Sequence, residues 1–90
     1  MIKTICPCEG FLQGNQTVVI IGENFFPGME VRFGSIPAYS KFLTNHAIEV
    51  VTPSRAAQGP VDVTLEFRTT VLTGKATSSK FLYLGKKVTT

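Results

Sequence analysis

One segment, residues 17–28, restricts the possible folds of this chain more than any other. It starts with the run Thr-Val-Val-Ile-Ile, whose β-branched side chains suit a pleated surface. Gly22 ends the run, and Asn24, Pro27 and Gly28 form a tight corner before the alternating segment 29–33. Two strands joined by such a corner predict an all-β fold, with the first strand buried on both faces.

Turn-forming residues also recur along the rest of the chain. Glycine or proline recurs about every ten residues, a spacing typical of a sandwich or barrel of short strands. Helices are not supported, since no window places apolar residues at helical spacing between capping residues. The sequence therefore predicts a β-sandwich of seven to eight short strands. The expected strands are 2–5, 17–21, 29–33, 36–43, 47–51, 61–68 and 81–84, with 9–15 as a turn and 69–79 as a loose hairpin region.

Alternation within these segments indicates which side chains face inward. In residues 61–68, Val, Val, Leu and Phe alternate with Asp, Thr, Glu and Arg. We expect a core that includes Val31, Phe33, Ile48, Val63, Leu65, Phe67, Phe81 and Tyr83.

Length and composition fit one globular domain. A chain of 90 residues, of which 43% are hydrophobic and 17% charged, is too apolar for a disordered segment. We expect a single domain over residues 1–90, with its core in 5–84 and a tail at 85–90. The N-terminus lacks the apolar stretch of a secretory signal, and no apolar run approaches the roughly 20 residues of a membrane span. We therefore expect no membrane partner.

The net charge of +3 is small, and the nine basic residues are dispersed. Nucleic-acid-binding domains usually carry a basic stripe or patch. The charge therefore argues against strong DNA binding by this domain alone and leaves open a weak, supporting contact with phosphates. Arg55, Lys86 and Lys87 are the candidates for contacts with DNA phosphates, because they lie in a loop and in the tail.

Cys6 and Cys8 are the only cysteines, and they flank Pro7. A bond between residues two apart on an extended chain would be strained, and no distant cysteine is available. Two thiols without a histidine cluster are also too few ligands for a structural zinc site. We expect free thiols, buried or half-buried, as in a protein of a reducing compartment.

Catalysis is not indicated. His46, the only histidine, lies in a turn, and no nucleophile or carboxylate stands at a recognisable spacing from it. The chain has no nucleophile elbow, phosphate loop or cluster of cysteine and histidine ligands. We expect a non-enzymatic domain with no cofactor, no metal and no small-molecule substrate, and a surface or loop-packing role for His46.

Asn15-Gln16-Thr17 matches the pattern for N-glycosylation. Such short matches arise easily, and an asparagine in a turn before a strand is the simpler interpretation. The motif still separates two locations for the protein, because only a secreted chain would carry a glycan there.

Some apolar residues remain after the predicted core is filled. Neighbours on an extended segment point to opposite sides, so one ring of the Phe25-Phe26 pair is left for the surface. If Phe81 and Tyr83 point inward, Leu82 and Leu84 point outward. We therefore predict a partner or dimer interface at Phe25, Phe26, Leu82 and Leu84; cover by the chain's own loops or tail is the alternative.

Several short segments recur in order in a known family. They are Cys8-Glu9-Gly10, residues 18–22, Asn24-Phe25, and residues 31–34, 51–53 and 61–65, followed by Phe81 and Tyr83. On these segments, residues 5–84 resemble the IPT/TIG family. Residues 21–26, 46–50, 52–55 and 63–65 are most similar to the TIG domain of early-B-cell-factor (Olf/COE-type) transcription factors.

This resemblance implies an immunoglobulin-like sandwich of the E-set type. It also implies a nuclear, DNA-binding, dimeric parent protein, in which the TIG domain helps dimers form beside a separate DNA-binding domain. The chain departs from the family pattern at Gly14-Asn15, where a double glycine is expected, in the loop 55–59, and at Cys6 and Cys8.

The leading hypothesis is therefore a non-catalytic interaction and dimerisation domain of a nuclear transcription factor, with a homodimer or a related subunit as its partner. Two alternatives stay open at this stage. One is an extracellular structural module of a plexin- or Met-like receptor, and the other is an accessory domain of a carbohydrate-active enzyme.

Overall fold

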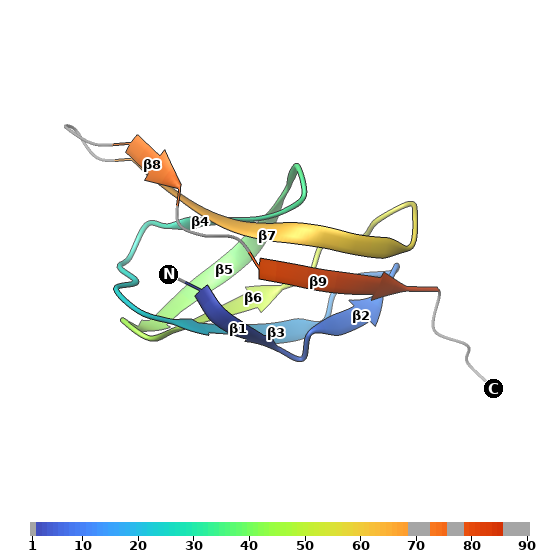
Figure 1. The fold of residues 1–90 in the computed structure, drawn as a ribbon, viewed down its shortest axis with the longest axis horizontal. Coiled ribbons are helices and arrows are strands. Elements are labelled where there is room, and N and C mark those ends of the chain that lie inside the picture. The colour runs from blue at the N-terminus through green and yellow to red at the C-terminus, as the bar shows by residue number, and fades with distance from the viewer. Residues whose placement is uncertain (1, 69–72, 76–78, 86–90) are drawn as a thin grey trace.

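The computed structural model describes residues 2–68, 73–75 and 79–85, and these residues form strands and connections without a helix (Figure 1). The predicted all-β sandwich is confirmed, with nine strands in the described part of the chain. They are β1 (Ile2–Cys6), β2 (Glu9–Phe11), β3 (Thr17–Gly22), β4 (Glu30–Phe33), β5 (Ile36–Thr44), β6 (Ala47–Val51), β7 (Gly59–Arg68), β8 (Thr73–Lys75) and β9 (Ser79–Leu84).

Strand β5 belongs to both layers of the sandwich. Its first residues, 36–38, pair antiparallel with β4, and its later residues, 39–44, pair antiparallel with β6. The strand order is β1-β3-β6-β5-β4-β7-β9-β2, with β8 beside β7. The first layer is thus β1-β3-β6-β5, and the second is β5-β4-β7-β9-β2, which lies over it in Figure 1.

The core lies between the layers and centres on three aromatic rings. Phe81 packs edge-to-face on Phe33 and on Tyr83, with ring centroids 5.2 Å apart in both pairs. The Tyr83 hydroxyl donates to the Pro53 carbonyl at 2.7 Å. Burial raises the pKa of the Tyr83 phenol, so the group stays neutral and keeps its proton for this bond. The rings thereby fix β9 against the loop between β6 and β7.

All but one of the predicted core residues are buried. The exception is Phe67, which is half-buried and packs against the core from the far end of β7. Its ring contacts the ring of Phe26 edge-to-face, at a centroid distance of 5.4 Å. The alternation of inward and outward residues in β7 therefore continues beyond the part of the strand that lies over the first layer.

Two sequence-based expectations about strands were wrong. Residues 9–11 form a strand rather than a turn, because they pair in parallel with residues 82–84 of β9. Strand β3 is not buried on both faces: Val18 and Ile20 face the core, whereas Val19 and Ile21 are only half-buried on the outer face. The first layer therefore has an apolar outer surface.

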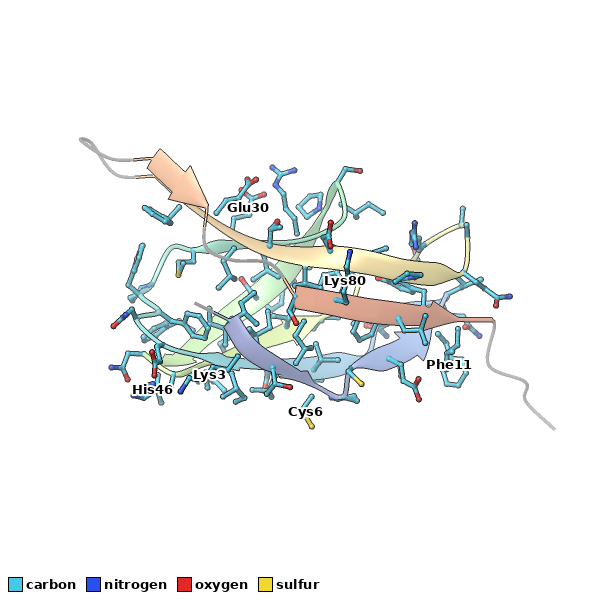
Figure 2. All side chains as sticks on the ribbon, in the orientation of Figure 1. Lys3, Cys6, Phe11, Glu30, His46 and Lys80 are labelled. Atoms are coloured by element: carbon cyan, nitrogen blue, oxygen red, sulfur yellow. The ribbon has the colours of Figure 1, made fainter. Side chains whose placement is uncertain are left out.

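The cysteines are free, as expected, but both are exposed rather than buried. Strand β1 stands at the edge of the first layer, and Figure 2 shows Cys6 pointing away from the sandwich. Neither thiol therefore contributes to the core.

Substitution of Leu65 tests which residues of β7 point toward the core. This side chain is fully buried, so Leu65→Ala should lower the free energy of unfolding by about 2–5 kcal/mol. Lys80→Ala on the neighbouring strand is the control: its ion pair with Asp62 is exposed, and such pairs contribute less than about 1 kcal/mol. Urea denaturation measures both. A Leu65→Ala chain as stable as the parent would mean that the strand faces the other way.

Exposed free thiols predict that the fold does not depend on the redox state. Thermal melting in the presence and absence of reductant should give the same midpoint, because no cysteine pair closes a loop. A lower midpoint after reduction would reveal a disulfide, within one chain or between two.

Candidate interaction surfaces

The two outer faces of the sandwich differ in chemistry. On the second layer, outward side chains form ion pairs: Arg32 Nη2 lies 3.0 Å from Glu30 Oε1, and Arg32 Nε lies 3.1 Å from Glu66 Oε2. Lys80 pairs with Asp62 in the same way. Figure 2 shows Glu30 and Lys80 on this side of the molecule. Each of these five charged residues has a partner within the chain, as on an ordinary solvated surface.

The outer face of the first layer is apolar over much of β3 and β6, whereas β1 adds the exposed Thr4 and Cys6 beside Ile21 and Val19. Its outward positions on the three strands β3, β6 and β5 are in register, so their side chains stand in rows across the sheet. We name this surface the β3–β6–β5 face; its residues are Thr17, Val19, Ile21, Tyr39, Lys41, Ala47, Glu49 and Val51. Tyr39 is 75% exposed, and the aliphatic members are half-buried by their neighbours alone.

Lys41 and Glu49 are the two charged residues of this face. They stand directly opposite each other on β5 and β6, and Val19 continues the same row on β3. Opposite charges at directly opposed positions support the pairing of two strands. The face is therefore an apolar surface with one charge of each sign at neighbouring positions.

The predicted interface residues do not form one patch. Phe25 is a correction: it is only 3% exposed, and its N–H donates to the Asn45 carbonyl, so it belongs to the core. Phe26 is the outward ring of the pair, at 37% exposure, and it contacts Phe67.

Leu82 and Leu84 lie elsewhere, on β9. Leu82 is exposed and stands in register with Pro60 of β7 and Glu9 of β2, and Leu84 is half-buried beside Phe11. Seven residues of β7, or about 23 Å at 3.3 Å per residue, separate Pro60 from Phe67, the neighbour of Phe26. The surface thus has one apolar site near Phe26 and another near Leu82.

Strand β5 carries most of the exposed apolar residues, which the sequence analysis did not single out. Six large apolar side chains in the described residues are exposed, and four of them, Ile36, Tyr39, Phe42 and Leu43, lie on β5. Pro37 and the absence of a clean alternation made this strand look irregular. The density of large apolar residues in 36–43 was the available signal.

A groove of about 310 Å³ lies on the inner side of β5. Phe42 borders it from β5 and Phe26 from the connection between β3 and β4, and both rings are 37% exposed. Its remaining lining residues are Gly28, Met29, Glu30, Ala38, Ser40 and Ile48. The groove follows from the divergence of β5 from β4 beyond Ala38, where their pairing ends.

The predicted phosphate contacts fall only partly within the described residues. Arg55 lies in the connection between β6 and β7, and its guanidinium carbon stands 5.7 Å from the centre of the Tyr83 ring. It is half-buried there, with Nη1 at 3.5 Å from the Gly59 carbonyl. Lys86 and Lys87 lie outside the described residues.

His46, Glu23 and Asn15 each have a partner within the chain. His46 is exposed, and its Nδ1 lies 3.1 Å from the Gly22 carbonyl. A hydrogen bond from Lys3, together with its charge, lowers the pKa of the exposed Glu23 carboxyl. Asn15 is exposed in a turn with φ of 58°, and its N–H donates to the Thr52 carbonyl at 2.8 Å.

Residues 2–68, 73–75 and 79–85 contain no group of three or more metal-binding side chains and no helix long and apolar enough to span a membrane.

Known proteins resemble the chain over nearly its whole length. The family model described as the IPT/TIG domain matches residues 1–83. The chain is 45% identical to transcription factor COE1-A of Danio rerio over 82 residues, 91% of the chain and 14% of that protein. It is 42% identical to transcription factor collier of Drosophila melanogaster over 83 residues, 92% of the chain and 14% of that protein.

The similarity extends to a nematode protein. The chain is 41% identical over 88 residues to transcription factor unc-3 of Caenorhabditis elegans, which is 93% of the chain and 18% of that protein. The chain thus spans less than a fifth of the length of these relatives. The family match over residues 1–83 and the all-β sandwich agree: the chain belongs to the IPT/TIG domain family, and its relatives are transcription factors of the COE type.

Proposed function

We propose that this domain joins two copies of a nuclear COE-type transcription factor through the β3–β6–β5 face. The apolar character of that face carries the proposal. Val19, Ile21 and Val51 point outward from an interior part of the sheet, where a solvated antiparallel sheet normally carries polar side chains. A contiguous apolar surface of this kind marks a contact with another protein.

The charges on the face suit a second copy of the same chain. A two-fold contact brings one surface against itself, so a basic residue must meet an acidic one. Lys41 and Glu49 stand side by side, and a two-fold axis near them places each beside its opposite in the partner copy. The face is self-complementary in charge as well as in polarity.

The size of the face predicts a modest contact. Three strands about 4.8 Å apart and about five residues long cover a footprint of roughly 14 Å by 17 Å. Two such surfaces bury an area at or below the lower end of specific interfaces, about 1,200 Å². The domain alone therefore forms a weak dimer, and other parts of the parent protein add to its stability.

The proposed role is non-catalytic. The relatives named above are transcription factors, and His46, the only histidine of the chain, has its Nδ1 at 3.1 Å from the Gly22 carbonyl. Binding of DNA is assigned to another part of the parent protein. Contacts of Arg55, Lys86 and Lys87 with DNA phosphates stay a prediction; the Arg55 guanidinium lies over the Tyr83 ring, so only part of it is available.

Leu82 and Leu84 offer a second surface for dimerisation, because Leu82 is 39% exposed. This site is smaller, and Glu9 stands beside Leu82 without an opposite charge in the same row. We therefore place the contact on the β3–β6–β5 face, and a Leu82→Glu variant separates the two sites.

Val19→Lys should abolish dimerisation while leaving the fold intact. The new ammonium group would be desolvated in the dimer, but in the monomer it lies opposite Glu49 on the outer face. Thr64→Glu is the control, because Thr64 is also half-buried and outward, on the other layer, and the new carboxylate lies opposite Arg32. Sedimentation equilibrium of the chain at high concentration measures the association.

The parent, Thr64→Glu and Leu82→Glu should associate alike, and Val19→Lys should sediment as a monomer with an unchanged far-ultraviolet spectrum. A Val19→Lys chain that still dimerises, or a parent that is monomeric at every concentration, would rule out this face.

A further inference from the structure

Strand β5 has a free edge over part of its length. Residues 39–44 pair with β6 on one side. On the other side the ladder with β4 ends at Ala38, opposite Val31, and no described strand continues it. The main-chain N–H and C=O groups that point away from β6 in this stretch are therefore a template for pairing with another strand.

Natural proteins usually block such edges with proline, inward-pointing charges or bulges. Here Pro37 lies in the part of β5 that is already paired with β4, and the irregularity in the ladder with β6 falls at the far end, between Phe42 and Thr44. Residues 39–42 between them contain one charged residue, Lys41, and it lies on the outer face. This stretch is open to a further strand.

The groove lies on the inner side of the same edge. Ser40 and Phe42 of β5 line it together with Phe26 and Met29 from the preceding connection. Ile48, only 3% exposed, also lines it, so the groove reaches the core. A strand that paired with β5 would alternate its side chains, placing every second one over this groove.

On the outer face of the sheet, the β5 edge favours an added strand that carries an acidic residue. Lys41 has Glu49 directly opposite it on β6, and an added strand would place a residue directly opposite Lys41 on its other side. An acidic residue there would complete a row of alternating charges, which favours strand pairing.

We propose that the β5 edge binds an extended peptide segment of a partner protein, by addition of a strand to the first layer. The segment pairs with residues 39–42, places apolar side chains in the groove beside Phe26 and Phe42, and sets an acidic residue opposite Lys41. This mode of recognition draws affinity from main-chain hydrogen bonds and selectivity from alternate side chains. The site shares Tyr39 and Lys41 with the dimerisation face, but its groove lies on the other side of the sheet, and strand addition does not depend on dimerisation.

A second copy of the chain is a poorer occupant of this edge. In an antiparallel two-fold pair of β5 edges centred on Lys41, this residue would stand opposite Lys41 of the other copy. Like charges at directly opposed positions destabilise strand pairing.

Selection of a displayed library of random linear nine-residue peptides against the 90-residue chain tests the proposal. Enriched peptides should alternate apolar residues and carry an acidic residue between two of them. Amide shifts on titration with the synthetic peptide should concentrate at residues 39–44 and 26–30. N-methylation of the peptide backbone at its central residues should weaken binding at least tenfold, because it removes donors without changing side chains.

Variants of the chain distinguish peptide binding in the groove from nonspecific binding to exposed apolar side chains. Ser40→Trp fills the groove and Phe42→Ser removes one wall, and each should weaken binding at least tenfold with an unchanged melting midpoint. Leu82→Ser is the matched control, because Leu82 is about as exposed as Phe42, at 39% against 37%, and it should bind as the parent does.

Four results would overturn the proposal. They are a selection without enrichment, peptides that bind Ser40→Trp and Phe42→Ser as well as the parent, N-methylated peptides that bind undiminished, and amide shifts centred on other strands. A concentration-dependent self-association that shifts residues 39–44 in the absence of peptide would assign the edge to a second copy instead.

Discussion

The division of β5 between the two layers is the constraint on which the rest of the structure depends. Its first residues hold β4, and its later residues hold β6, so a single strand joins the layers along one side of the core. On this side the divergence of β5 from β4 opens the groove and leaves residues 39–44 paired on one side only. The strand that joins the layers therefore also carries the exposed apolar residues Tyr39 and Phe42.

The outer faces of the two layers differ in how many charged residues they carry. The second layer covers its outer face with ion pairs around Arg32 and between Lys80 and Asp62. The first layer instead presents Val19, Ile21 and Val51 at interior positions of its sheet. Both faces cover the same core, so core packing does not require the difference. A partner on the first layer would explain it, and the neighbouring charges of Lys41 and Glu49 are the reason we propose a second copy of the chain.

Sequence periodicity predicted the strands that face the core on one side, such as β7 with Val63 and Leu65, because alternation depends on the strand's own residues. It did not predict β2, whose pairing with β9 joins segments far apart in the chain. It predicted that one ring of the Phe25-Phe26 pair faces the core and the other faces the surface, but it did not predict which ring takes which side. It also took the continuous apolar run of β3 as buried on both faces, since local pattern does not reveal whether a second layer covers the strand. The β3–β6–β5 face, which we propose as the dimerisation surface, was missed for the same reason.

Intermolecular nuclear Overhauser contacts between isotope-labelled and unlabelled copies of the chain test the dimerisation face most directly. The account predicts contacts from the methyl groups of Val19, Ile21 and Val51 to residues of the same face in the second copy, including the ring of Tyr39. Contacts confined to Leu82 and Leu84, or no intermolecular contact at millimolar concentration, would contradict it.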